Sequence, residues 1–250
     1  MAVEADFKFQ PEIAADIAVG LIRRGEVTFG DYKLRSGLWS PLYVDLRPTA
    51  SAVEENPIAP GMSKADQLKF RKSVILGYSA MLELLEGEFE HIQAVPEAVC
   101  GLAPMVAYET DASYLHRRIK PKDYGKPSDG ILGDFNQGDR TVFIDDLISS
   151  SGAKVDEKRL VEDISRSGRA GDEVRGAGLV VQHCLILLDR ETGGIEAAAQ
   201  EGLQVHAGLD ITDVLEIGRA EGAISSSDYR IYQAYMSGEL TTSEDKHKFA

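Results

Sequence analysis

Two hydrophobic patterns alternate along the chain and predict its elements. Short strands are predicted at 91–94, 113–115, 142–144, 179–188 and 203–206, and those at 142–144 and 179–188 have the largely apolar sequence typical of buried strands. Between them apolar side chains recur every three to four residues, as in amphipathic helices, at 11–24, 64–85, 153–164, 195–201, 211–221 and 225–236. Strands that alternate with helices predict an α/β fold with a central, mostly parallel sheet flanked by helices on both faces.

Three segments depart from this pattern. Residues 32–35 and 42–46 alternate like the strands of a hairpin, with Ser36 and Gly37 between them. The polar, glycine-rich stretch 165–178 looks like an exposed insertion, to which no role can be assigned. We expect residues 237–250 to be a loose tail.

The stretch 141–154, TVFIDDLISSSGAK, has the strongest chemical character in the chain. A short apolar strand is followed by Asp145 and Asp146, then by a hydroxyl-rich turn at 149–152 and a helix. In open parallel sheets, ligands bind beyond the carboxyl ends of the strands. A turn of small residues at a helix N-terminus presents backbone N–H groups to an anion.

The two acids would repel such an anion, so they suit a neutral polyol or a metal instead. A site for both phosphate and a diol suggests a sugar phosphate as the ligand. Two alternatives remain open at this stretch. Paired aspartates also follow strands in magnesium-binding receiver-like domains, and Ser/Gly turns are common in α/β loops.

A basic segment at 116–130 precedes this stretch. Its prolines and glycines oppose a stable helix, so a loop is expected. One interpretation is a solvated surface loop, as most charged runs are. The other is a cationic loop that closes over a polyphosphate and excludes water.

Two further places have candidate binding residues. Arg190 follows the apolar run 179–188 and could bind a carboxylate with two parallel hydrogen bonds, or pair with Asp189 or Glu191 at the surface. The hairpin segment carries Lys33 and Arg35 close to aromatic rings. It could hold a flat anionic ligand or be an ordinary edge hairpin.

Composition and charge narrow the classes of function. The chain has 250 residues, of which 43% are hydrophobic, so it can bury one sizeable core. Its net charge of −14 argues against general binding of nucleic acids or anionic membranes. No apolar run approaches the roughly 18 residues of a membrane span. Cys100 and Cys184 are expected to be buried free thiols in a reducing compartment, which favours a cytoplasmic protein.

Four segments, in this order, resemble those of the orotate phosphoribosyltransferases, a family of type I phosphoribosyltransferases. LRSGLWSPLYVDLR (34–47) is similar to the family's orotate segment, and RRIKPKDYG (117–125) to its catalytic loop. TVFIDDLISSSGA (141–153) resembles the motif for phosphoribosyl pyrophosphate (PRPP), and LILLDRETGG (185–194) resembles the orotate-arginine segment. The resemblance covers most of the chain, from about 13 to 235.

The resemblance implies one phosphoribosyltransferase domain over 1–250, with a small N-terminal hood at about 1–50 and a mobile loop. The implied reaction transfers the phosphoribosyl group of PRPP to orotate. It would give orotidine 5′-monophosphate and pyrophosphate in pyrimidine (UMP) biosynthesis. The implied magnesium ion would be held mainly by PRPP oxygens and not by the protein. The catalytic loop would reach into the neighbouring subunit of a homodimer.

The resemblance also implies roles for individual residues. The implied catalytic residues are Arg118, Lys120, Lys122 and Asp146. The implied PRPP site comprises Arg35, Arg118, Lys122, Tyr124, Asp145, Asp146, Leu147, Ile148, Ser149, Ser150, Ser151, Gly152 and Ala153, with the two acids on the ribose hydroxyls. The implied orotate site comprises Tyr43, Val44, Ser149 and Arg190.

Three positions depart from the family pattern. Ser151 stands where the family usually has glycine, Ile119 where it usually has a lysine, and Arg35 where it usually has a lysine. These departures keep two alternatives open. One is a PRPP-binding regulatory protein of the same fold, and the other is a phosphoribosyltransferase for another base.

Overall fold

The structure is a computed structural model that describes residues 6–34, 39–50, 62–96, 98–117, 131–149, 154–156, 158 and 178–249. The strands are β1 (Val27–Lys33), β2 (Trp39–Val44), β3 (His91–Ala94), β4 (Ser113–Arg117), β5 (Ile131–Leu132), β6 (Arg140–Ile148), β7 (Val180–Asp189) and β8 (Gln204–Asp210). The helices are α1 (Pro11–Arg23), α2 (Arg47–Ala50), α3 (Lys64–Glu83), α4 (Ala103–Thr110), α6 (Gly194–Gln200), α7 (Ile211–Ala220), α8 (Ser226–Met236) and the 3₁₀ helix η1 (Ser243–Lys248).

The central sheet has six strands in the order β5-β4-β3-β6-β7-β8. The pairs from β4 to β8 are parallel, and only the edge pair β4–β5 is antiparallel. The chain leaves β3 toward one edge through β4 and then returns to β6, from which it continues to the other edge. The strand order therefore reverses between β3 and β6, and ligands of such sheets bind at this switch point. The prediction of a mostly parallel sheet is confirmed.

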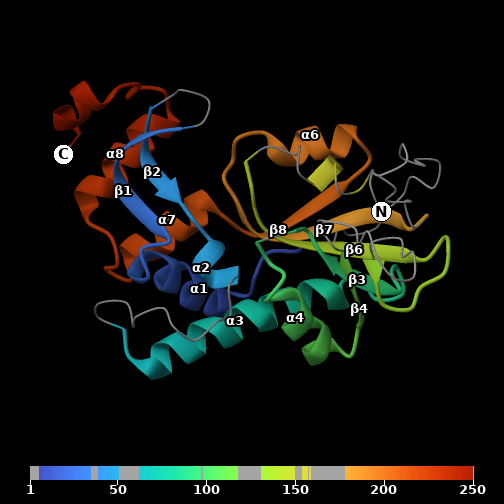
Figure 1. Ribbon diagram of the computed structural model, residues 1–250. Helices are drawn as coiled ribbons and strands as arrows, with labels where there is room; N and C mark the ends of the chain where they lie inside the picture. Colours follow the sequence, from blue (N-terminus) through green and yellow to red (C-terminus); the bar gives the residue numbers. More distant parts are fainter. Residues whose placement is uncertain are drawn as a thin grey trace, which may run out of the picture.

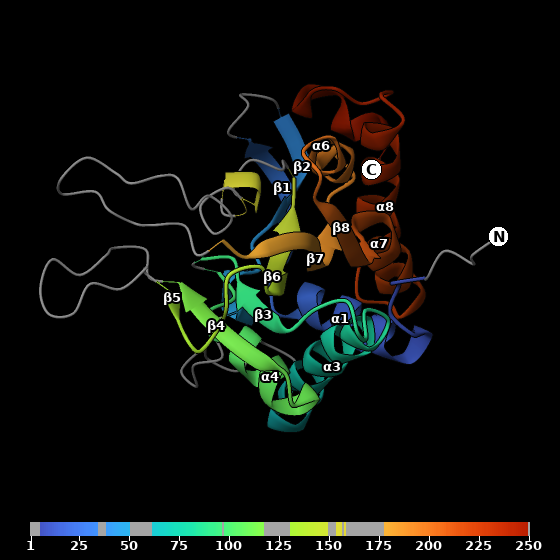
Figure 2. The ribbon, with the colours of Figure 1, turned by 90° about the vertical axis from the view of Figure 1, so that its right-hand side faces the viewer.

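Helices cover both faces of the sheet, as predicted. Figures 1 and 2 show α1, α3 and α4 on one face and α6 on the other. Alternate residues of β6 point into the two layers. Val142 and Ile144 lie in the core with α1 and α3, whereas Phe143 lies in the core with α6. Because both faces are buried, these strands are continuous apolar runs in the sequence.

The local sequence of helix α3 determines where the helix begins and which of its side chains face the core. Ser63 caps its N-terminus in a reciprocal capping box with Asp66, as the predicted start at 64 requires. Val74 and Tyr78 point inward, as expected. Leu68, also expected to point inward, is 54% exposed, and Phe70 is buried in the first turns instead.

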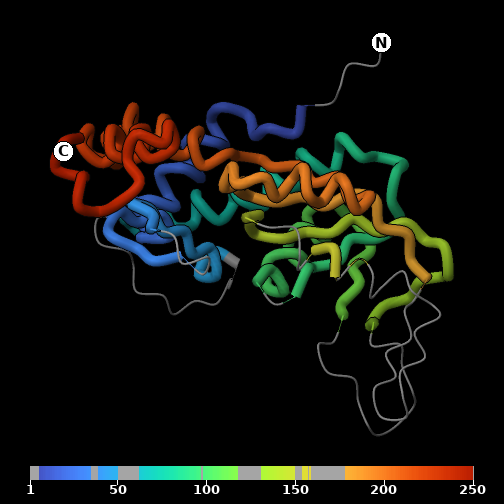
Figure 3. Tube along the Cα trace, turned by 90° about the horizontal axis from the view of Figure 1, so that it is seen from above, coloured from blue at the N-terminus to red at the C-terminus, as the bar shows by residue number. Residues whose placement is uncertain are grey.

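The antiparallel pair β1–β2 forms a small second sheet beside the main one. We call this sheet, together with α8 and η1, the hood. Figure 3 shows the blue strands β1 and β2 next to the red C-terminal helices, so distant parts of the chain build the hood together. The Trp39 ring of β2 meets the Tyr235 ring of α8 edge-on, with 5.7 Å between centroids.

The expectation of a loose tail is wrong for residues 237–249. Leu240 is only 1% exposed and packs with Ile231 of α8. Lys246 of η1 reaches back to β1, where its Nζ lies 3.1 Å from Asp31 Oδ1. Two apolar residues in an otherwise polar segment, Leu240 and Phe249, provide the packing, so the composition of the tail did not reveal it.

Two further expectations concern thiols and membranes. Both cysteines are free; Cys184 is fully buried in β7, whereas Cys100 is only partly buried. In the part of the chain that the structure describes, no helix has the length and apolar character needed to cross a membrane.

Candidate active site

Asp145 and Asp146 lie at the carboxyl end of β6, beside the switch point of the sheet. The sequence placed them after the strand, but they belong to it. Strand β6 continues to pair with β7 from Asp145↔Ile186 to Ile148↔Asp189. The two acids end the apolar pattern without ending the backbone pairing, so the strand is longer than its hydrophobic run.

A buried ion pair holds the first of these acids. Asp145 and Lys154 are only 6% and 3% exposed, and Lys154 Nζ lies 2.6 Å from Asp145 Oδ2. The same ammonium group donates to the Leu147 carbonyl oxygen at 2.7 Å. From α3, the Tyr78 hydroxyl donates to the Asp145 carbonyl oxygen at 2.5 Å. Sequence reasoning assigned no role to Lys154 or Tyr78.

The second acid has unusual electrostatics. Burial, and then the neighbouring Asp145 carboxylate, raise the pKa of Asp146 to about 7. The Leu147 N–H, which donates to Asp146 Oδ1 at 2.7 Å, and the Lys154 charge oppose this rise. Asp146 therefore changes charge near neutral pH, which is typical of functional carboxyl groups.

The ionisable groups around Asp145 and Asp146 keep one charge state near neutral pH. Burial lowers the pKa of Lys154, but Asp145 and the other neighbouring groups together raise it by more, so the net pKa is raised and the ammonium stays charged. Burial raises the pKa of the Tyr78 hydroxyl and of the Cys184 thiol, so both stay neutral. Asp146 is thus the one of these groups whose charge changes near pH 7.

The loop after β7 packs closely against the carboxyl end of β6. Gly193 has φ +80°, and a Cβ on Gly194 would lie 2.7 Å from Ile148 Cγ1. Thr192 Oγ1 donates to the Ser149 carbonyl oxygen at 2.7 Å. The N–H of Arg190 donates to the Ile148 carbonyl oxygen at 3.1 Å. The backbone of Arg190 is therefore fixed beside Ile148 and Ser149, at the carboxyl end of β6.

The acids beside Arg190 are engaged elsewhere. Asp189 Oδ1 accepts the N–H of Glu191 at 3.0 Å, and Glu191 Oε2 accepts the N–H of Thr212 at 3.0 Å. Glu191 adopts φ +55°, a conformation that these bonds hold in place. Within the described parts of the chain, the Arg190 guanidinium forms no ion pair with Asp189 or Glu191, so it can serve a ligand.

Strand β2 of the hood and the short helix α2 lie toward the main sheet in Figure 1. Tyr43 is 40% exposed and its ring lies 5.3 Å from that of Tyr32. The Val44 side chain is in the core, so only its backbone can meet a ligand. Arg47, which the sequence did not single out, pairs with Asp45 at 2.5 Å and is within electrostatic reach of Asp146.

Several predicted site residues lie outside the described part of the chain. They are Arg35, Arg118, Lys120, Lys122, Tyr124, Ser150, Ser151, Gly152 and Ala153, together with Ile119 and most of the 165–178 stretch. Their roles stay predictions. Of the PRPP set, Ile148 is described and fully buried against Gly194, so its side chain cannot touch a ligand.

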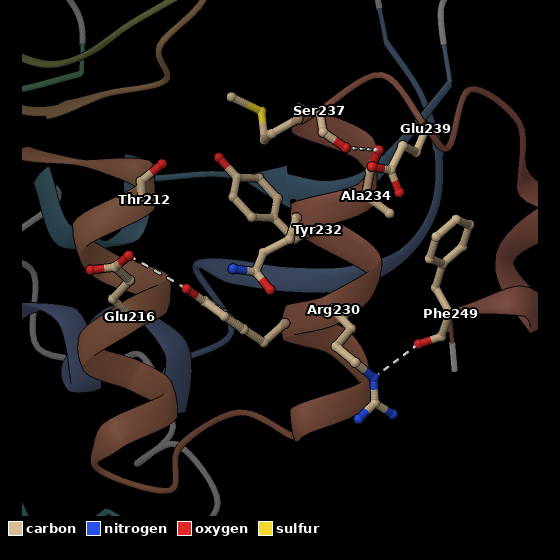
Figure 4. Close-up of a pocket in the computed structure, with 11 residues that line it drawn as sticks. Thr212, Glu216, Arg230, Tyr232, Ala234, Ser237, Glu239 and Phe249 are labelled. Atoms are coloured by element: carbon tan, nitrogen blue, oxygen red, sulfur yellow. Dashed lines mark hydrogen bonds between the residues drawn. The ribbon is translucent and has the colours of Figure 1, made fainter.

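A cavity of about 540 Å³ lies elsewhere, between α7, α8 and the C-terminal tail (Figure 4). Its lining includes Thr212, Tyr232 and Arg230, whose Nε donates to the Phe249 carbonyl oxygen at 3.3 Å. It contains neither the acid pair nor Arg190. The acid pair and Arg190 therefore place the candidate site at the carboxyl ends of β6 and β7 and not in this cavity.

Comparison with known proteins gives relatives by sequence and by structure, although no family model matches the chain. The bovine (Bos taurus) uridine 5′-monophosphate synthase is 29% identical over 211 residues, which is 81% of this chain but 37% of that protein. The orotate phosphoribosyltransferase of Chlamydia caviae is 24% identical over 91% of this chain and 97% of its own. That of Halobacterium salinarum is 28% identical over 81% and 98%. The chain is thus similar in sequence to orotate phosphoribosyltransferases over most of its length.

Solved structures agree on the fold. The Leishmania donovani UMP synthase superposes with a TM-score of 0.64 at 24% identity, over 90% of this chain and 42% of that one. The Aeropyrum pernix orotate phosphoribosyltransferase gives 0.51 at 22% identity, over 82% and 97%. The described elements thus form the type I phosphoribosyltransferase fold, as the sequence predicted. The chain spans less than half of the UMP synthases, but nearly all of the shorter relatives.

Proposed function

We propose that the chain is an orotate phosphoribosyltransferase, which transfers the phosphoribosyl group of PRPP to orotate in pyrimidine (UMP) biosynthesis. The observation that carries the proposal is the acid pair Asp145–Asp146 at the switch point of the sheet, in the stretch for which the sequence predicts a phosphate turn. The names and high coverage of the relatives support the same reaction.

The reaction needs charge in defined places. Orotate N1 forms a bond to C1′ of the ribose while the C1′–oxygen bond breaks, and pyrophosphate leaves with the electron pair. Positive charge develops on the ribose, where the Asp146 carboxylate would stabilise it through the hydroxyls. Arg190 would bind the orotate carboxylate, and Lys122 and Arg118 would neutralise the leaving pyrophosphate.

Magnesium is part of this proposal as a companion of PRPP. Among the described residues, no three His, Cys, Asp or Glu side chains form a group that could hold a metal ion. Asp145 already pairs with Lys154. In the proposal, the ion is held mainly by the oxygens of PRPP, where it would offset the pyrophosphate charge.

An absorbance assay of orotate consumption, with PRPP and Mg²⁺, tests the proposal. We expect turnover by the wild-type chain. We expect Arg190→Ala to raise the KM for orotate by about tenfold or more, because it removes a charge-assisted bidentate contact. We expect Lys122→Ala to act mainly on kcat, because its partner is the leaving group.

Two results would redirect the proposal. If PRPP binds but a panel of other bases, and not orotate, releases pyrophosphate, the chain is a phosphoribosyltransferase for another base. If PRPP binds and no base reacts, the regulatory alternative gains support, which the three departures at Arg35, Ile119 and Ser151 kept open.

We also propose a cytoplasmic homodimer in which each catalytic loop serves the partner's site. A mixture of Lys122→Ala and Arg190→Ala chains, dissociated and reassociated, is then expected to regain activity. Half of the dimers would be mixed, with one intact site each, which gives about a quarter of the wild-type rate. Light scattering gives the subunit number. A mixture no more active than its two parents would show that each loop serves its own subunit.

A further inference from the structure

A lysine that is almost fully buried is rare unless it is paired, and Lys154 is 3% exposed. It lies at the start of the helix that follows the predicted phosphate turn. Its ammonium group contacts Asp145 Oδ2 at 2.6 Å and the Leu147 carbonyl oxygen at 2.7 Å. Both partners belong to β6, on the other side of the turn. Lys154 therefore joins the two ends of the turn.

The two acids differ in how far their carboxylate oxygens are already bonded and buried. Asp145 has Oδ2 on Lys154 and Oδ1 on the N–H of Asp146 at 2.9 Å, and its side chain is buried. Asp146 is half-buried, and its Oδ1 accepts the N–H of Leu147 at 2.7 Å. The accessible carboxylate of the pair is thus Asp146, whereas Asp145 acts as an anchor.

We propose that Lys154 is a positioning residue of the ribose site: it holds the carboxyl end of β6 in place through Asp145 and the Leu147 carbonyl oxygen, and leaves Asp146 as the carboxylate that receives the ribose. This inference rests on the proposed function and deepens it. It differs from the resemblance, which implies that both acids bind ribose hydroxyls.

The groups around Asp145 and Asp146 determine how the charge of the two acids depends on pH. Tyr78 faces it from α3 and Cys184 from β7, and both stay neutral near pH 7 because burial raises their pKa values. Arg47 of α2 adds a positive charge within reach of Asp146. The Lys154 charge lowers the pKa of Asp146 against the larger effects of burial and Asp145. Removing Lys154 should therefore raise the pKa of Asp146 further.

The test is calorimetric binding of PRPP with Mg²⁺ between pH 5.5 and 9. We expect Lys154→Met to weaken binding at pH 7 by about tenfold or more, and to move the acid limb of the affinity profile up by about one pH unit or more. Lys154→Arg should restore the limb. Lys158→Met is the matched control, because Lys158 of the same helix donates to the Val181 carbonyl oxygen at 2.7 Å.

A double variant distinguishes a specific loss of PRPP binding from misfolding of the single variant. Lys154→Met with Asp145→Asn removes both buried charges, so it should fold, keep weak binding and return the acid limb toward that of the wild type. A Lys154→Met chain that is folded by thermal melting and binds PRPP like the wild type at every pH would overturn the inference. A wild-type chain that binds no PRPP at any pH would instead refute the proposed function.

Discussion

Asp145→Ala is expected to destabilise the protein by about 3–5 kcal/mol, because it leaves the buried Lys154 ammonium without its carboxylate. Both side chains are nearly inaccessible, and water cannot replace the lost contact. The Leu147 carbonyl oxygen would remain as the ammonium's described partner. Urea denaturation at pH 7, with the free energy of unfolding extrapolated to water, measures the effect.

An exposed ion pair is the matched control. Lys246 and Asp31 also pair across the fold, but the Asp31 side chain is 59% exposed. Asp31→Ala should cost no more than about 1 kcal/mol. Adding Lys154→Met to Asp145→Ala should recover most of the lost stability, because no unpaired charge remains. An Asp145→Ala chain as stable as Asp31→Ala would show that the ammonium finds other stabilisation.

The main sheet was predictable because its strands are buried on both faces. Burial on both sides makes β6 and β7 largely apolar runs that any periodicity analysis finds, whereas the short strand β3 keeps two buried polar residues, His91 and Gln93. The switch point followed from strand order, which the sequence did not supply. Its site residues were found only because strand, acid pair and turn stand together in one stretch.

The residues that sequence analysis missed were missed for one physical reason. The bond between Lys154 and Asp145 spans nine positions and crosses a turn, so neither helical nor strand periodicity relates the two residues. A lysine in an amphipathic helix also looks like surface. Arg47 and the packed Leu240 depend in the same way on contacts between distant segments. Sequence patterns report local burial, whereas these residues act through tertiary neighbours.

Asp146→Asn is expected to change activity and stability in opposite directions. The variant keeps the shape of the side chain but loses the charge that would face the developing positive charge on ribose. Removing one such group should lower kcat/KM for PRPP by about 10²–10³. The orotate assay at pH 8, where Asp146 is ionised in the wild type, measures this loss.

The stability effect follows from the direction of the pKa shift. The pKa of Asp146 rises from 3.8 to about 7 on folding, so the folded chain holds a proton between these values that the unfolded chain has lost. Wild-type stability therefore falls as pH rises through this window. Asparagine removes the cost of ionisation, so the variant should be more stable than the wild type by up to about 4 kcal/mol at pH 8, and equal to it near pH 3.

Asp45→Asn provides a control of opposite sign. Hydrogen bonds from Arg47 lower the pKa of Asp45, so its ionised form stabilises the fold at pH 8 and asparagine should reduce stability there. Urea denaturation of the two variants at both pH values separates the cases. A gain for Asp146→Asn only at high pH, together with lost activity, would show a carboxylate kept for chemistry at the expense of stability. A loss of stability at pH 8 would mean that Asp146 is stabilised as an anion and that its pKa is not raised.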